Sequence, residues 1–233
     1  MEKKRVLSVV YWCVMASFVL PVAYTVYKVI VTPNTLILED FARSRADYTL
    51  MLLQCVLGIS VMNIPSLLAK KFKFEMPVGL YITYIVFLYG AIFLGEIQNF
   101  YNLIPFWDDI LHGFSSMMTG LFGFMSVEIL NRVSKKKIRL SPFFIALFAF
   151  CFSVTIGAVW EIYEFLADGI LGLNMQKFIT EAGVVLKGHE AISDTMKDII
   201  VDCGGALTAT IIGYLSIKNK RGWIHDYLTN GQE

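Results

Sequence analysis

The sequence predicts an all-α, polytopic membrane protein with six transmembrane helices and both termini in the cytoplasm. Three observations lead to this class. The 233 residues are 56% hydrophobic, above the roughly 45–50% of soluble proteins, and the mean hydropathy is +0.61. Repeated apolar runs are long enough to cross a bilayer, because a core of about 30 Å needs about 20 helical residues. Finally, the basic residues are divided unequally between the loops.

Six segments have the required length and composition, and the whole chain, 1–233, is expected to form a single integral membrane domain. The expected spans are 6–31, 48–69, 77–97, 107–130, 142–167 and 195–217. The first follows basic residues, as in a signal peptide, but its apolar stretch exceeds the usual length of about 7–15 residues. We therefore interpret it as a retained span.

Lysine and arginine orient the bundle. If the N-terminus is inside, the outer loops hold only four of the 20 basic residues, Arg43, Arg45, Lys177 and Lys187. Basic residues favour the cytoplasmic side, so this orientation is expected. The net charge of +1 and the scattered basic residues give no sign of a nucleic-acid partner.

Ionisable residues gather near the outer ends of three predicted spans, in the stretches FWDDILHGF, WEIYEF and DTMKDIIVD. They are Asp108, Asp109, His112, Glu161, Glu164, Asp194, Asp198 and Asp202. Such residues are costly inside a membrane, about 2.5–3.5 kcal/mol each at a helix centre on insertion scales. Their concentration at one level therefore suggests a shared polar site facing the outer leaflet.

Helical spacing and charge refine this prediction. Asp108 and His112 are four residues apart and share a helix face. Neighbouring carboxylates repel one another unless a positive charge intervenes. Lys197 and a protonated His112 would supply at most two such charges, so we expect either protonated carboxylates or a bound cation. Small residues on the fourth and sixth spans favour close packing of those helices, which would bring His112 and Asp198 together. These small residues are Gly113, Gly120, Gly123, Gly204, Gly205 and Thr208.

The motifs DDILHGF, WEIYEF and DTMKDIIVDCGGAL occur in the order found in YjdF-like bacterial inner-membrane proteins, and residues 80–217 resemble that family. The chain is more distantly similar to VanZ-like proteins, which are associated with glycopeptide resistance. The resemblance implies an architecture, a location in the bacterial inner membrane and a polar site, but no reaction. It places the family's polar positions on Asp108, His112, Glu161, Glu164, Asp194 and Asp198, whereas Asp109 and Asp202 look like additions.

Each polar residue also has a structural interpretation. Asp108, Asp109 and Asp194 with Ser193 are candidates for helix caps, Glu164 for a side chain that reaches the outer water, and His112 for an interhelical hydrogen-bonding residue. Their joint occurrence favours a functional site. Asp108, His112, Glu161 and Asp198 are the candidate catalytic residues. The candidate ligands of a divalent metal are Asp108, His112, Glu161, Glu164, Asp194 and Asp198.

Three classes of function stay open. The first is a metal-dependent enzyme that acts on a lipid headgroup or a lipid-linked envelope precursor, with the cation activating water or polarising an oxygen. The second is a proton- or cation-coupled transporter, although the titratable groups crowd one leaflet. The third is a non-catalytic membrane factor in envelope stress or resistance. In each class the membrane lipid is the expected surrounding partner.

Overall fold

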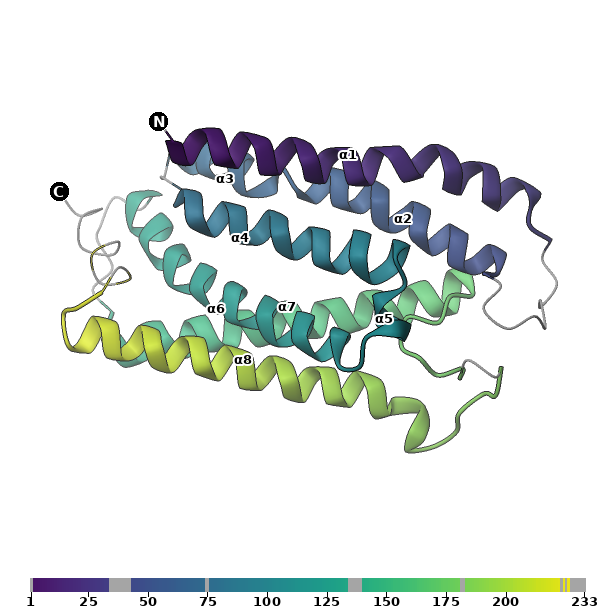
Figure 1. Ribbon diagram of the computed structural model, residues 1–233. Helices are drawn as coiled ribbons and strands as arrows, with labels where there is room; N and C mark the ends of the chain where they lie inside the picture. The colour runs from purple at the N-terminus through teal and green to yellow at the C-terminus, as the bar shows by residue number, and fades with distance from the viewer. Residues whose placement is uncertain are drawn as a thin grey trace. The chain divides into compact units, whose positions relative to one another are not determined.

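The computed structural model describes residues 2–33, 43–73, 76–133, 140–180, 183–222, 224 and 226. Helices form nearly all of the regular structure in these ranges, which contain no β-strand apart from one isolated antiparallel bridge between Ile179 and Val185. The all-α prediction is therefore confirmed. Figure 1 shows the order of the helices along the chain.

Six helical stretches are long and apolar enough to cross a membrane, as predicted. They are Arg5–Val31, Arg45–Phe72, Val78–Ile97, Trp107–Val127, Pro142–Leu171 and Glu190–Lys218. Their ends lie within a few residues of the predicted boundaries. The cytoplasmic placement of both termini and the single-domain organisation stay predictions.

The chain divides into two compact units. The first comprises Met1–Trp107 and Ala167–Leu173, and the second comprises Asp108–Leu166 and Asn174–Glu233. All of the candidate site residues lie in the second unit.

Six helical elements belong to the first unit: α1 (Glu2–Val31), α2 (Arg45–Val61), α3 (Ile64–Phe72), α4 (Val78–Leu88), the π-helix η1 (Tyr89–Ile97) and α5 (Phe100–Leu103). The predicted span 48–69 is thus divided between α2 and α3. Pro65 lies in the first turn of α3, where its missing N–H costs nothing. Two tyrosines of α4 satisfy carbonyls freed at the break, since Tyr84 donates to Val61 O (2.9 Å) and Tyr81 to Met62 O (3.2 Å).

The third span changes its helix type along its length. Its first half is the α-helix α4, and its second half, η1, is a π-helix. The hydropathy pattern does not predict this wider winding. Arg43 donates to the carbonyl of Ile97 (2.8 Å) and to that of Glu96 (3.3 Å) at the end of η1. These bonds satisfy carbonyls that a helix end leaves without intrahelical partners.

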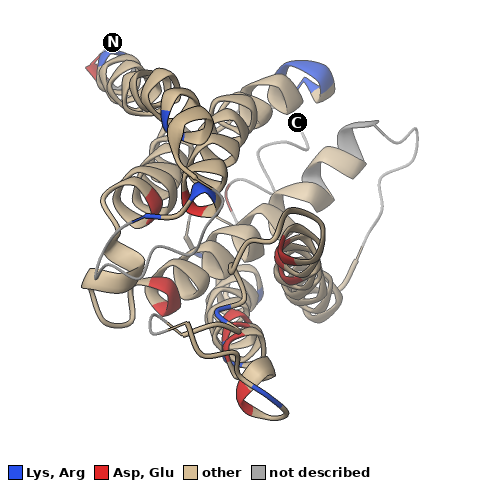
Figure 2. Ribbon diagram, turned by 90° about the vertical axis from the view of Figure 1, so that its right-hand side faces the viewer, with Lys and Arg blue, Asp and Glu red and all other residues tan. Residues whose placement is uncertain are grey.

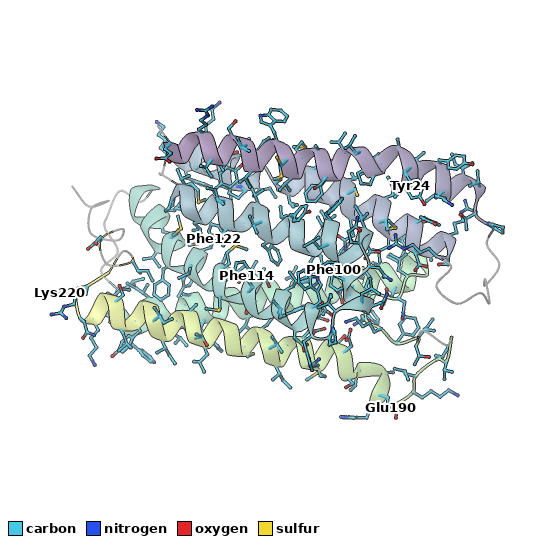
Figure 3. All side chains as sticks on the ribbon, in the orientation of Figure 1. Tyr24, Phe100, Phe114, Phe122, Glu190 and Lys220 are labelled. Atoms are coloured by element: carbon cyan, nitrogen blue, oxygen red, sulfur yellow. The ribbon has the colours of Figure 1, made fainter. Side chains whose placement is uncertain are left out.

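The second unit contains α6 (Trp107–Val133), α7 (Pro142–Leu171), the short 3₁₀ helix η2 (Glu190–Ile192) and α8 (Ser193–Lys218). The first residue of α6 and the last residues of α7 are counted in the first unit. Phe114 and Phe122 lie along α6, and Glu190 and Lys220 mark the two ends of α8 (Figure 3). The exposed side chains on these helices include large apolar ones, as expected for surfaces that face lipid.

Small residues allow the three long helices of the second unit to approach closely. A Cβ atom added to Gly205 of α8 would collide with Ser116 Oγ and the Gly113 carbonyl of α6, and one added to Gly120 would lie 3.1 Å from Ala209 Cβ. The predicted close packing of the fourth and sixth spans is confirmed. Gly123 instead faces α7, since an added Cβ would lie 2.6 Å from Ala149 Cα.

Candidate metal centre

The second unit brings ionisable side chains together at the end where α6 and α8 begin. Figure 2 views the molecule from this end and shows acidic residues in red interspersed with basic residues in blue. Because α6 starts at Trp107, Asp108 and His112 lie one turn apart on the same face. His112 Nε2 is 3.8 Å from Asp108 Oδ1.

Asp198 of α8 completes a group of three potential metal ligands. Asp108, His112 and Asp198 each offer one ligand atom, and these atoms all lie within 4.8 Å of one another. His112 and Asp198 are buried, at 8% and 2% exposed. Ligands of a cation with bond lengths of about 2.0–2.2 Å lie up to about 4.4 Å apart, so small shifts would close the group around an ion. One nitrogen and two carboxylate oxygens suit Mn²⁺ or Zn²⁺. A coordination shell completed by further oxygen ligands would suit Mg²⁺.

Asp202 holds the other side of the His112 ring. His112 Nδ1 lies 3.3 Å from Asp202 Oδ1, and the Asp202 side chain is buried. A histidine that binds a metal usually has a carboxylate or a carbonyl at its second ring nitrogen, which fixes the ring and its tautomer. Gly157 of α7 makes room for this carboxylate, because a Cβ atom there would collide with Asp202. Although Asp202 looked like an addition in the sequence, the structure places it directly against His112.

Glu161 of α7 is a deeply enclosed carboxylate whose two oxygens both lack a hydrogen-bond partner among the described residues. Its side chain is 4% exposed. Its charge interacts with those of His112, Asp194 and Asp202, so it faces the cluster. The nearby Thr195 hydroxyl accepts a bond from Gln176 Nε2 (2.8 Å). A buried carboxylate is costly without compensation, and a cation in the cluster would supply it.

Glu164 is also part of the cluster and does not reach the outer water, the alternative suggested by the sequence. It is 8% exposed, and its Oε1 accepts a 2.8 Å hydrogen bond from Trp160 Nε1 one turn earlier in α7. The Glu164 charge interacts with those of Glu161, Asp108 and Asp198. Glu164 is thus held by α7 itself, beside the group of three potential ligands.

A third positive charge, which the sequence analysis missed, enters from the segment before α8. Lys177 Nζ bonds to Asp108 Oδ2, and it is also 3.1 Å from Asp194 Oδ1. Burial lowers the pKa of Lys177, but Asp108 and Asp194 outweigh it and hold that pKa well above its ordinary value. The expectation that only Lys197 and His112 supply positive charge is therefore wrong. The sequence places Lys177 in an outer loop with Lys187, and no local signal marks it as a partner of the carboxylate cluster.

The remaining acidic residues have separate partners. Asp109 Oδ2 pairs with Lys197 Nζ at 2.7 Å, on the side of α6 next to the start of α8. Asp194 does not cap α8, because the N-cap residue is Ile192 and makes no side-chain bond. The second oxygen of Asp194 is buried and has no hydrogen-bond partner in the described ranges. Asp194 therefore belongs to the Lys177 side of the cluster.

Hydroxyl groups lie one turn further along α6 from the cluster. Ser153 of α7 donates to the Ser116 carbonyl of α6 (2.7 Å), and the hydroxyls of Ser153 and Thr119 are 2.8 Å apart. Ser116 donates to the Gly113 carbonyl (3.0 Å). These bonds tie α6 to α7 and satisfy hydroxyls that the membrane core would otherwise leave unpaired.

Comparison with known proteins gives a family and one relative. Residues 24–219 match the model of a family described as "Predicted membrane protein (DUF2238)". An uncharacterized protein of Thermotoga maritima is 33% identical over 139 residues, which are 59% of this chain. The matched part spans 62% of the length of that relative. No solved structure matches the chain.

Proposed function

We propose that the second unit of this chain, which belongs to the DUF2238 family of predicted membrane proteins, binds a divalent cation. Asp108, His112 and Asp198 would be the protein ligands, with Glu161 beside them. We further propose that the protein is a metal-dependent membrane enzyme that acts on a lipid headgroup or a lipid-linked envelope precursor. The resemblance to YjdF-like and VanZ-like proteins and the inner-membrane location stay predictions.

One observation carries the cation proposal. Three ligand atoms from α6 and α8 lie within 4.8 Å of one another, and the buried Glu161 carboxylate, which has no hydrogen-bond partner among the described residues, interacts with the charge of His112. Acidic residues at a helix end alone could be caps or ion pairs. A carboxylate that is 4% exposed and has no donor is a different case, since its burial is costly unless a proton or a cation compensates.

The residues of the second unit would have separate chemical roles in such an enzyme. A divalent cation would polarise an oxygen of the substrate or lower the pKa of a bound water. Glu161 accepts no hydrogen bond from the described residues, so it is free to take a proton as a general base. Asp202, at 3.3 Å from Nδ1, orients His112 so that Nε2 is on the side of Asp108. Glu164 is held by Trp160 and adds negative potential that favours a cation.

The position of the cluster supports a headgroup substrate. His112 is five residues into α6 and Asp198 five residues into α8, which corresponds to about 8 Å from each helix start at 1.5 Å per residue. This depth is close to the boundary between the hydrocarbon core and the headgroups. The hydroxyls further along α6 and α7 bond to one another and to backbone carbonyls, as in ordinary helix packing. This arrangement favours an enzyme over a transporter.

Metal analysis of the purified protein tests the cation site. We expect one equivalent of Mn²⁺ or Zn²⁺ in the wild-type protein, and less than a tenth of that in His112→Ala and Asp198→Ala. Glu190→Gln is the matched control, because Glu190 is an exposed acidic residue just before α8. A wild-type protein without metal at neutral pH would contradict the proposal, as would equal metal content in all four proteins.

A second experiment separates the function classes. Cells that lack the protein should accumulate an unprocessed lipid or envelope precursor, and wild-type protein should restore the profile whereas Glu161→Gln should not. A transporter would instead show an ion flux in liposomes that Glu161→Gln abolishes. Restoration of the profile by Glu161→Gln, with normal metal content, would favour a non-catalytic membrane factor.

A further inference from the structure

The segment between α7 and α8 forms a compact turn that carries Lys177. Asn174 Oδ1 accepts from the backbone N–H of Ile179 (2.9 Å), and Asn174 Nδ2 donates to the Ile179 carbonyl (2.7 Å). The bridge between Ile179 and Val185 is extended by a bond from Leu186 N to Phe178 O (2.9 Å). The segment therefore has defined internal bonds that can hold one side chain in place.

Lys177 has a backbone conformation that a lysine rarely adopts. Its φ is +49°, in the left-handed region that is uncommon for residues with a Cβ. Such conformations persist where surrounding contacts hold them, often at functional sites. Two such contacts are present, since Gln176 bonds to Thr195 of α8 and the Lys177 ammonium bonds to Asp108 and Asp194.

The two oxygens of Asp108 face different groups. Oδ1 lies 3.8 Å from His112 Nε2, on the side of the potential metal ligands. Oδ2 bonds to Lys177. The ammonium therefore adjoins the position of a cation without requiring the oxygen that faces it, and both positive charges can be present together.

We propose that this arrangement binds a phosphate group between the cation and the Lys177 ammonium. The inference deepens the proposed function and rests on it, because it requires the cation. Three protein ligands leave positions open on Mg²⁺ or Mn²⁺, and such ions are commonly held by one or two carboxylates plus a phosphate of the ligand. Lysine binds phosphate as a point charge. With the starts of α6 and α8 at the membrane surface, as predicted, the site would lie near the level of the lipid phosphates.

The surrounding carboxylates make phosphate binding depend on the cation. Asp194 partly neutralises Lys177, and Glu161, Glu164 and Asp202 are buried nearby. A phosphate dianion would be repelled by this cluster in the absence of a divalent cation. Removal of the Lys177 charge has opposite effects on the two ligands, because it relieves repulsion of the cation but removes attraction of the phosphate.

The test is a ³¹P relaxation measurement on the full chain in a phosphorus-free detergent with one equivalent of Mn²⁺. The probes are inorganic phosphate and a soluble short-chain phosphatidic acid. We expect Mn²⁺-dependent broadening of at least one probe with wild-type protein. In Lys177→Gln the phosphate affinity should fall at least tenfold while the Mn²⁺ affinity stays equal or rises. Lys187→Gln is the control, because Lys187 is an exposed lysine of the same segment.

The outcomes separate the two proposals. A wild-type protein that binds no Mn²⁺ contradicts the proposed function. Mn²⁺ binding that His112→Ala abolishes, without broadening of either probe, overturns the phosphate inference alone. Equal phosphate affinity in Lys177→Gln and wild type also overturns it. Broadening of phosphatidic acid but not of inorganic phosphate identifies a lipid headgroup as the source, and the reverse identifies free phosphate.

Discussion

Replacement of Asp202 by Asn is expected to weaken Mn²⁺ binding about tenfold with little change in the fold. Asp202 Oδ1 lies 3.3 Å from His112 Nδ1, and the side chain is 3% exposed. Asn has nearly the same volume, so the close contact with Gly157 is retained. It has no charge, however, and its amide fixes the histidine tautomer less well. Loss of such outer partners costs about 10–100-fold in metal affinity, and tenfold corresponds to about 1.4 kcal/mol.

The assay is a titration of free Mn²⁺ by electron paramagnetic resonance with wild type, Asp202→Asn and Asp202→Ala. Asp202→Ala should lose close to a hundredfold in Mn²⁺ affinity, at the upper end of that range, because it removes the partner of His112 Nδ1 entirely. Asp109→Asn is the matched control, since Asp109 pairs with Lys197 at 2.7 Å and not with His112. The reasoning is refuted if Asp202→Asn binds Mn²⁺ as tightly as wild type, or if Asp109→Asn loses as much affinity.

Three further predictions concern packing, pH and orientation. Gly205→Ala should destabilise the protein by about 1–3 kcal/mol through overpacking. Gly204→Ala should leave the stability unchanged, because nothing lies within 4 Å of an added Cβ. Thermal unfolding in detergent measures both, and an equal change in the unfolding temperature of the two variants would contradict this reasoning. The raised pKa of Lys177 keeps its ion pairs charged below the unfolded value of about 10.4, and they are lost only as the pH rises through the folded pKa. The stability difference between wild type and Lys177→Gln should therefore be equal at pH 7 and about pH 9, and its disappearance at pH 9 would count against the pairing. An impermeant maleimide should label Lys187→Cys but not Lys220→Cys in intact cells, and the opposite pattern would reverse the predicted orientation.

Hydropathy was sufficient to predict the six spans because each needs only an apolar run of adequate length. It did not predict how each span is wound. The break between α2 and α3 depends on tyrosines of α4 that bond to the Val61 and Met62 carbonyls. Those donors are about twenty residues away in the sequence, so the local pattern around Pro65 did not reveal the break. The π-helical winding of η1 likewise leaves no mark in hydropathy.

The candidate site was predictable where it follows helix periodicity. The spacing of Asp108 and His112 placed them on one face, and small residues predicted the approach of α6 and α8 that brings Asp198 to them. The pairing of Asp202 with His112 could not be derived, because it depends on which face of α8 meets α6. A shift of one residue turns a helix by about 100°, and that register is set by close contacts such as Gly205 against Gly113 and Gly120 against Ala209.

The position of Lys177 explains why counting charges in the sequence underestimates the positive charge near the carboxylates. Counting only ionisable residues in the predicted spans left the carboxylates with two positive partners. The structure adds Lys177, from the segment outside the spans, whose ammonium pairs with Asp108 and Asp194 at the starts of α6 and α8. Even with this charge, Glu161 has no donor among the described residues. The lysine balances the charges of Asp108 and Asp194 but supplies no hydrogen bond to the buried Glu161 carboxylate, whose burial either a proton or the proposed divalent cation would compensate.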